Sequence, residues 1–247
     1  MWLDPMPSKE EIHKAYHSYY THNENQPNKN ILTELVTKTS DRLLLFFLRF
    51  TPIYKERKDF NNMYLSNIRP GRLLEVGCGK GDRLAFLADH GWTGEGQEVD
   101  SISAAIAAKK GIKVHLGPLE SFHLPASTYK AIVMSHVIEH IHEPLKVLTE
   151  CRRLLSQNGI LIAVTPNTDS LGHRIFKSFW RGLEPPRHVF LYRQKSLSRL
   201  QVPRLPEVHA LRRPGKPRLL RSAALRAPDV RNAGPFTIGD MSHRTED

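Results

Sequence analysis

Three glycines at alternate positions, Gly77, Gly79 and Gly81, follow a short apolar run and precede a helical pattern. A glycine turn of this kind opens nucleotide-binding α/β folds, because a side chain there would keep the ligand away from the backbone. A dinucleotide fingerprint would need a glycine at position 82, which is Asp, and a P-loop would need a Gly-Lys-Ser/Thr that is absent. The turn therefore indicates another nucleotide-type ligand, with a ligand-free strand-to-helix turn as the alternative.

A second group of chemically active side chains lies between Ser135 and Pro144, where His136, Glu139 and His140 are close in sequence. Histidine titrates near neutral pH and can act as a general base. The chain has 13 histidines, so a structural or surface role for each of these remains the alternative.

The elements that must position these residues alternate along the chain. Apolar runs predict strands over 72–76, 94–99, 113–116, 130–135 and 160–165. Helical patterns fall over 81–90, 101–110 and 144–155, and Asn158-Gly159 is expected to end the last of them. Repeated β-α units of this length predict an α/β fold with a doubly wound, mostly parallel sheet and right-handed crossovers.

These motifs together resemble the class I S-adenosylmethionine-dependent methyltransferases. Glu75-x-Gly77-x-Gly79-x-Gly81 is similar to their motif I, and the Glu139-His140 pair resembles the same place in ubiquinone-pathway O-methyltransferases. Segments 15–22 and 184–192 resemble the type 23 methyltransferases. The resemblance implies a Rossmann-like fold, S-adenosyl-L-methionine as the cofactor, and methyl transfer to a small-molecule acceptor, with oxygen as the expected acceptor atom.

The same resemblance implies roles for individual residues. Glu98, at the end of the second strand, would bind the ribose hydroxyls, with Asp100 in reserve, and Leu119 would contact adenine. A family acid is missing where Pro118 stands. The expected cofactor-binding residues are Glu75, Gly77, Cys78, Gly79, Gly81, Glu98, Leu119 and Ser135.

The candidate catalytic residues are three histidines in loops at the carboxyl edge of the sheet or in the segment that covers it. They are His136, His140 and His188. We expect no metal, because the cation-binding relatives have a further acid where this chain has His136. A site made of Glu139, His140 and His136 is the weaker alternative.

The character of the sequence changes after residue 200. Residues 201–247 contain six prolines and one aromatic, and no apolar period persists. We count five strands and expect a sheet that lacks the last two strands of its class. Our hypothesis is that residues 201–247 form a disordered, frame-shifted tail. The rest of the chain is expected to form a helical cap over 1–70 and an α/β domain over 71–200, with a substrate cover at 167–192.

Composition sets wider limits. The chain has 247 residues, a net charge of +11 and two cysteines without metal-type spacing. The charge is spread out and no nucleic-acid motif accompanies it, so no nucleic-acid partner is expected. We expect no transmembrane segment and a cytoplasmic protein, and the oligomeric state stays open. A truncated, inactive or weakly cofactor-binding relative and a basic nucleic-acid-binding protein are the two alternatives.

Overall fold

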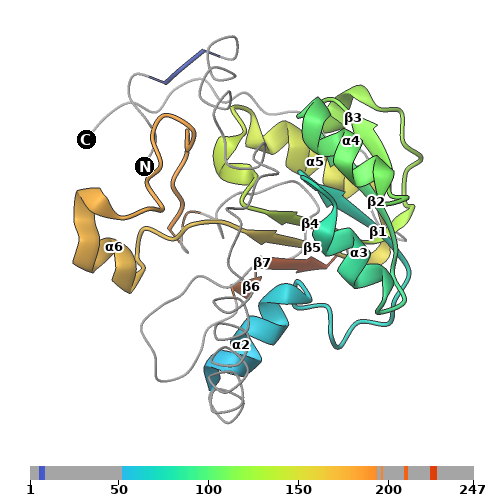
Figure 1. Cartoon of the computed structure of the whole chain (residues 1–247), viewed down its shortest axis with the longest axis horizontal. Helices are drawn as coiled ribbons and strands as arrows, with labels where there is room; N and C mark the ends of the chain where they lie inside the picture. The colour runs from blue at the N-terminus through green and yellow to red at the C-terminus, as the bar shows by residue number, and fades with distance from the viewer. Residues whose placement is uncertain (1–5, 9–51, 194–195, 197–208, 211–222, 227–247) are drawn as a thin grey trace, which may run out of the picture.

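The computed structural model describes residues 6–8, 52–193, 196, 209–210 and 223–226. Its centre is a seven-stranded sheet in the order β3-β2-β1-β4-β5-β7-β6 (Figure 1). The first five strands are parallel: β1 (Arg72–Val76), β2 (Thr93–Glu98), β3 (Lys113–Leu116), β4 (Tyr129–Ser135) and β5 (Leu155–Val164). The predicted doubly wound, mostly parallel α/β sheet is confirmed. Strand order reverses between β1 and β4, the place where such sheets bind ligands.

Helices connect the parallel strands where the sequence predicts them: α3 (Asp82–Ala88), α4 (Ser101–Lys109) and α5 (Pro144–Leu154). Outside this part of the chain, α2 (Pro52–Asn61) precedes β1, and α6 (Leu171–Phe176) follows β5. The 3₁₀ helices are η3 (Leu119–Ser121), η4 (Ile138–His140) and η5 (Lys177–Phe179). The connection between β3 and β4 contains the short η3. None of the helices in the described part of the chain is long and apolar enough to span a bilayer.

The core has two layers because successive strand residues point to opposite faces of the sheet. Leu74 and Ile132 belong to a cluster with the buried side of α5, whereas Leu73 and Val133 belong to a second cluster with α3. Strands buried on both faces consist of nearly continuous apolar residues, which is why β1 and β4 could be recognised as short apolar runs.

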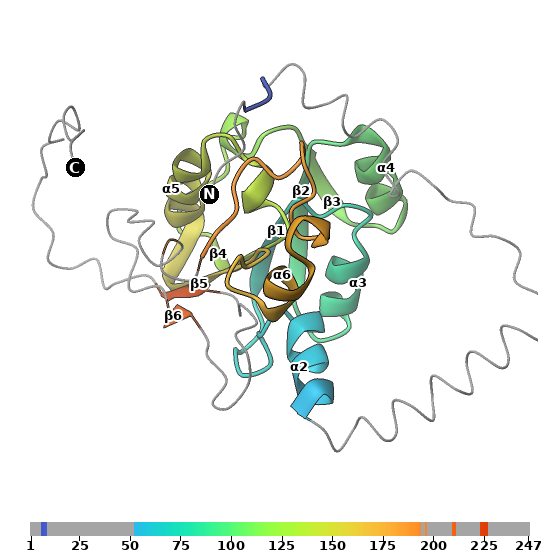
Figure 2. The same ribbon diagram turned by 90° about the vertical axis from the view of Figure 1, so that its left-hand side faces the viewer.

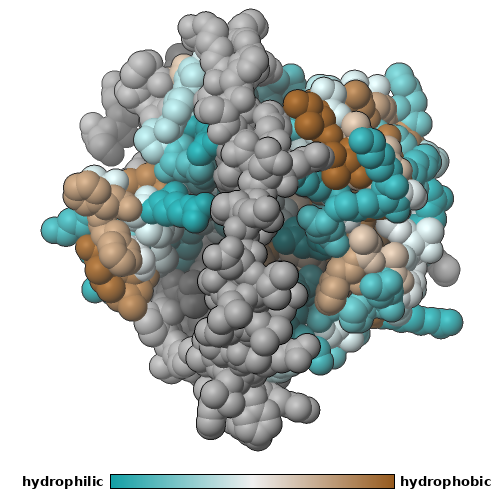
Figure 3. Space-filling view, viewed as in Figure 1, coloured by the Kyte–Doolittle hydropathy of each residue, from teal (hydrophilic) through white to brown (hydrophobic). Residues whose placement is uncertain are grey.

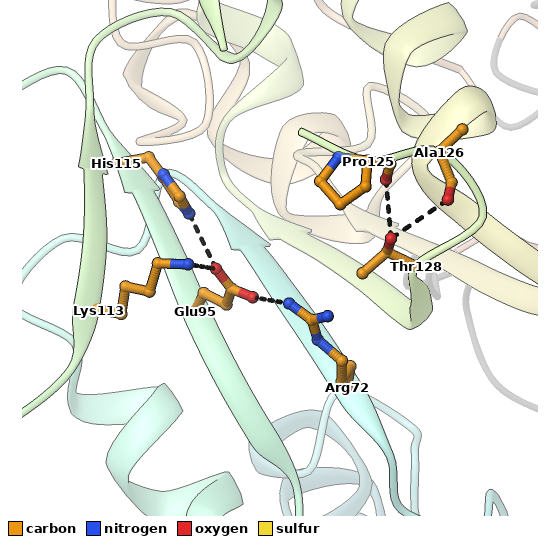
Figure 4. A network of polar contacts seen from close by, with 7 residues as sticks. All are labelled: Arg72, Glu95, Lys113, His115, Pro125, Ala126 and Thr128. Atoms are coloured by element: carbon orange, nitrogen blue, oxygen red, sulfur yellow. Dashed lines mark hydrogen bonds and ion pairs between the residues drawn. The ribbon is translucent and has the colours of Figure 1, made fainter. Parts of the chain in front are cut away.

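An ion-pair network links β1, β2 and β3. Glu95 of β2 lies between Arg72 of β1 and Lys113 and His115 of β3 (Figure 4). Burial alone would raise the pKa of Glu95, but hydrogen bonds from Lys113, His115 and Arg72 outweigh it and lower the pKa to about 2. This acid therefore has a structural role.

The expected end of the sheet is corrected by β7 and β6. The sheet does not lack its last two strands: β7 (Ala223–Arg226) pairs antiparallel with Ile160–Ala163 of β5, and β6 (His209–Ala210) pairs with β7. Both strands fall within 201–247, where the sequence predicts a disordered tail. Alanine has little strand preference, so pairing with the open edge of β5 decides the conformation of β7.

The end of α5 also differs from the prediction. The helix stops at Leu154, and β5 begins at once with Leu155, so Asn158-Gly159 lies inside β5 instead of capping the helix. Tyr129 pairs with Leu155 whereas Ala131 pairs with Ile160, and the extra β5 residues form an irregularity in the ladder. Asn158 has a φ of 58°, so the turn preference of Asn-Gly is used within the strand.

The segment after β5, where a substrate cover is expected over 167–192, contains α6 and η5. In Figure 1 these helices lie to the left of the sheet, and in Figure 2 they lie in front of it. The chain then turns at Glu184–His188, and a bridge between Asn167 and Tyr192 closes the excursion. Most of the helical cap expected over 1–70, residues 9–51, lies outside the described residues.

Candidate functional site

The glycine turn sits at the carboxyl end of β1, beside the reversal of strand order. All three alternate glycines have positive φ, at 68°, 54° and 74°. A Cβ at Gly77 would overlap Val137, and one at Gly81 would overlap Ile112, so these two glycines permit close packing. A Cβ at Gly79 would meet nothing within 4 Å. The middle glycine therefore borders open space in which a ligand can approach the backbone.

Glu98 faces this open position from the end of β2. Its Oε2 accepts the Gly79 N–H at 2.7 Å, and its Oε1 accepts the N–H groups of Val99 at 2.8 Å and Asp100 at 3.0 Å. A carboxylate has about four acceptor positions, so one more hydrogen bond can be accepted. The chemistry of this acceptor and the space beside Gly79 fit a ligand with a ribose hydroxyl.

Asp100, the reserve candidate for the ribose, serves another purpose. It is the N-cap of α4, and its carboxylate accepts the N–H groups of Ile102 and Ser103, each at 3.2 Å. The Ser103 hydroxyl also donates to it at 2.6 Å. Helix capping explains an acid at this position.

The two other predicted cofactor contacts have different surroundings. Leu119 is 2% exposed and packs in the α5-side core, so its side chain is not presented on the surface of the loop after β3. Ser135 is the last residue of β4 and half-buried, opposite Val164 of β5. The structure brings Ser135 to the carboxyl edge, but it does not place the Leu119 side chain there.

Glu75 and Cys78 flank the first glycine. Burial raises the pKa of Glu75 to about 7, although Arg83 opposes this shift through an ion pair of 2.9 Å. The other oxygen of Glu75 has no hydrogen-bond partner among the described residues. Burial raises the pKa of Cys78 to about 12, so its thiol stays protonated and is no nucleophile at neutral pH.

The second predicted group converges on Glu139, which is fully buried in η4. His136, at a φ of 56°, follows β4 directly, and its Nδ1 lies 3.2 Å from Oε1 of Glu139. Burial would raise the pKa of Glu139, but the hydrogen bond from His136 and the nearby His140 lower it overall. The ionised carboxylate can therefore orient His136, whose side chain is 53% exposed.

The rings of His140 and His188 lie side by side, although the two residues are far apart in the sequence. Their ring centroids are 4.7 Å apart. Nδ1–H of His140 donates to the Arg187 carbonyl at 2.9 Å, and Nδ1–H of His188 donates to the Gly182 carbonyl at 2.8 Å. Burial lowers the pKa of His140, which keeps its ring neutral at pH 7.

The covering segment is tied to this group through the backbone. The Glu139 carbonyl accepts the N–H groups of Val189 at 2.9 Å and Phe190 at 3.1 Å. One donor atom from each of Glu139, His140 and His188 lies within 4.8 Å of the others. We refer to these three residues as the Glu139 cluster. Their donor set could hold a divalent cation, with His188 in place of the His136 considered from the sequence.

Three residues with clear structural roles in the site escape the sequence reasoning. Arg83 of α3 forms an ion pair with Glu75 of β1, and Glu184 lies 3.3 Å from Nε2 of His188. The backbone carbonyl of Gln97 accepts the N–H groups of Gly77 and Cys78, and its side-chain amide donates to the Gly117 carbonyl at 2.6 Å. The available sequence signal for Gln97 was its position directly before Glu98.

Comparisons with known proteins show similarity to methyltransferases. A family model described as a methyltransferase domain, the type 23 family, matches residues 49–201. A Mycolicibacterium smegmatis protein named as a probable S-adenosylmethionine-dependent methyltransferase is 30% identical over 97 residues, which cover 38% of each chain. A ubiquinone biosynthesis O-methyltransferase of Caulobacter is 28% identical over 103 residues, covering 39% of this chain and 41% of that protein.

The chain thus spans about two fifths of the length of these curated relatives. Among solved structures, a SAM dependent methyltransferase from Archaeoglobus fulgidus has 21% identity, covers 64% of this chain and 71% of its own, and has a TM-score of 0.49. A likeness of that size carries no argument about activity.

Proposed function

The chain belongs to the methyltransferase domain family, and on this premise we propose that it transfers a methyl group from S-adenosyl-L-methionine to an oxygen of a small molecule. The observation that carries the proposal is the pairing of Gly79 with Glu98, which leaves open space and an acceptor position at the carboxyl ends of β1 and β2. The two histidine-containing loops flank the same edge of the sheet.

The glycine turn and Glu98 would hold the cofactor. Gly79 allows its backbone to approach the ligand, and Oε2 of Glu98 would accept a ribose hydroxyl with its remaining lone pair. The bound cofactor supplies a methyl group already activated by a sulfonium centre. What the chain must add is alignment of the acceptor, which can contribute about 7–11 kcal/mol.

His136 is the best candidate for the general base. It is the most exposed of the three predicted catalytic histidines, and its Nδ1–H donates to the buried Glu139 carboxylate. Nε2 would then take the proton from the acceptor hydroxyl, and Glu139 would stabilise the imidazolium. His140, with its lowered pKa, would remain a neutral neighbour, and His188 would position it.

The experiment measures label transfer from methyl-labelled S-adenosylmethionine to a panel of phenols and catechols, with primary amines as the second panel. His136→Gln is expected to lower kcat by about 10²–10⁴ without weakening cofactor binding. His90→Gln is the matched control, because His90 is exposed and lies just beyond the far end of α3. An unchanged kcat in His136→Gln would refute its role as the base.

Calorimetric titration of the wild type separates this function from a weakly cofactor-binding relative. Binding of S-adenosylmethionine supports the enzyme, whereas its absence refutes the proposed cofactor and activity together. Labelling of amines but not phenols would replace oxygen by nitrogen as the acceptor. We also propose a cytoplasmic location, since both cysteines are free and buried.

A further inference from the structure

The excursion between β5 and the Asn167–Tyr192 bridge presents unusually apolar side chains to solvent. Leu171 is 45% exposed, Ile175 60%, Phe176 57% and Phe179 91%. None of the residues in α6 or η5 is buried, so this segment contributes nothing to the core. Figure 3 shows apolar surface gathered over α6. We call residues 171–181 the α6 platform.

Interactions on the inner side hold the platform in shape. The rings of His173 and Trp180 are 5.0 Å apart, and Nδ1–H of His173 donates to the Thr168 carbonyl at 2.7 Å. The Ser170 hydroxyl accepts the His173 N–H at 3.2 Å and so caps α6. A Cβ at Gly172 would approach the Trp180 ring to 3.0 Å. Because these contacts fold the segment back on itself, its apolar side chains are directed outward.

The platform also carries positive charge. Arg174, Lys177 and Arg181 are exposed, and within the described residues none of them forms an ion pair. Residues 170–183 contain no acid. The acids on either side are engaged, because Asp169 lies 3.8 Å from Arg193 and Glu184 pairs with Arg187. The three cations are therefore available to an anionic surface.

We propose that the α6 platform docks this protein onto an anionic phospholipid bilayer. Leu171 and Ile175 lie one turn apart on α6, and Phe179 follows in η5. These three side chains would enter the boundary between headgroups and acyl chains, while the cations contact lipid phosphates. An apolar protein partner would leave the cations unmatched, and a nucleic acid would leave the aliphatic side chains exposed. A bilayer with negative charge uses both features, and this inference is independent of the proposed methyl transfer.

The test is co-sedimentation of the full chain with vesicles of phosphatidylcholine, with and without phosphatidylserine. Binding is expected only with phosphatidylserine, and it should weaken as salt is added. Replacing Arg174 and Lys177 together by Gln should weaken binding about 25-fold, or about fivefold for each cation. Phe179→Ser should weaken it about tenfold or more. Leu145→Ser is the matched control, because Leu145 is 51% exposed on α5, away from the platform.

Both platform variants are expected to keep the melting temperature of the wild type, because no buried residue is altered. Absence of phosphatidylserine-dependent binding would overturn the proposal, and so would an equal loss in Leu145→Ser. Light scattering provides a further refutation. If the wild type is a dimer that Phe179→Ser dissociates, and vesicles are not bound, the platform is a contact between two copies of the chain.

Discussion

Replacing Glu98 by Gln tests the cofactor site most directly, because the geometry separates two consequences of losing the charge. The carboxylate accepts three backbone N–H groups and has one acceptor position left. A charge-assisted hydrogen bond contributes about 1.5–3 kcal/mol, so losing it to the ribose should raise the Kd for S-adenosylmethionine by about 10- to 150-fold. Glutamine keeps the shape and one oxygen, whereas alanine would leave all three N–H groups without this partner.

The assay is isothermal titration calorimetry with S-adenosylmethionine, accompanied by urea unfolding. Glu98→Gln should also lower the free energy of unfolding by about 1–3 kcal/mol, because the Gly79 N–H loses an ionised acceptor. Asp100→Asn is the control: asparagine caps a helix about as well as aspartate, so both Kd and stability should stay near wild type. Equal Kd values for wild type and Glu98→Gln would refute the ribose assignment, and a loss of affinity only in Asp100→Asn would transfer it to Asp100.

Four further outcomes are expected. Burial raises the pKa of Glu75 from 4.5 to about 7, so its contribution to stability is complete below pH 4.5 and is lost as pH rises through about 7. The free energy of unfolding, measured with urea across pH, should therefore fall by about 3 kcal/mol over this range, and Glu75→Gln should remove the fall. The pKa of Glu95 is lowered to about 2, so its contribution is present above pH 4.5 and is lost as pH falls through about 2; Glu95→Gln should abolish that acid-dependent loss, and an unchanged acid profile would contradict it. Gly81→Ala should lower the free energy of unfolding by about 1–3 kcal/mol through overlap with Ile112, whereas Gly79→Ala should lower it less and mainly weaken cofactor binding. If the two variants change stability and cofactor binding equally, the open space at Gly79 is refuted. Methyl transfer should survive EDTA, and added Zn²⁺ should inhibit it by occupying the Glu139 cluster; loss of activity in EDTA that Mg²⁺ restores would show a metal requirement.

Local sequence was sufficient for the parallel part of the fold. The apolar runs of β1 and β4 were predicted to within one residue, because strands buried on both faces need continuous apolar residues whatever their neighbours are. The glycine turn was equally visible, since positive φ at three alternate positions has few sequence solutions. The association of Glu139 with a histidine was predictable only because Glu139 and His140 are neighbours in the sequence.

Other features depended on contacts between distant segments. β7 has an alanine-rich sequence with little strand preference, and it exists as a strand because β5 offers an unpaired edge. Glu98 and Asp100 are two residues apart, and nothing local distinguishes them; the start of α4 engages Asp100 and leaves Glu98 to face Gly79. His188 reaches His140 only because the covering segment folds back onto the Glu139 carbonyl.

The sequence by itself thus determined the parallel strands, the helices between them and where the chain must turn through glycine, because periodicity and backbone freedom are local properties. The tertiary structure decided which acid faces the open space at Gly79, which histidines meet, and how the sheet ends. Those outcomes depend on hydrogen-bond partners and packing surfaces supplied by residues far away in the chain, and a local pattern carries no information about them.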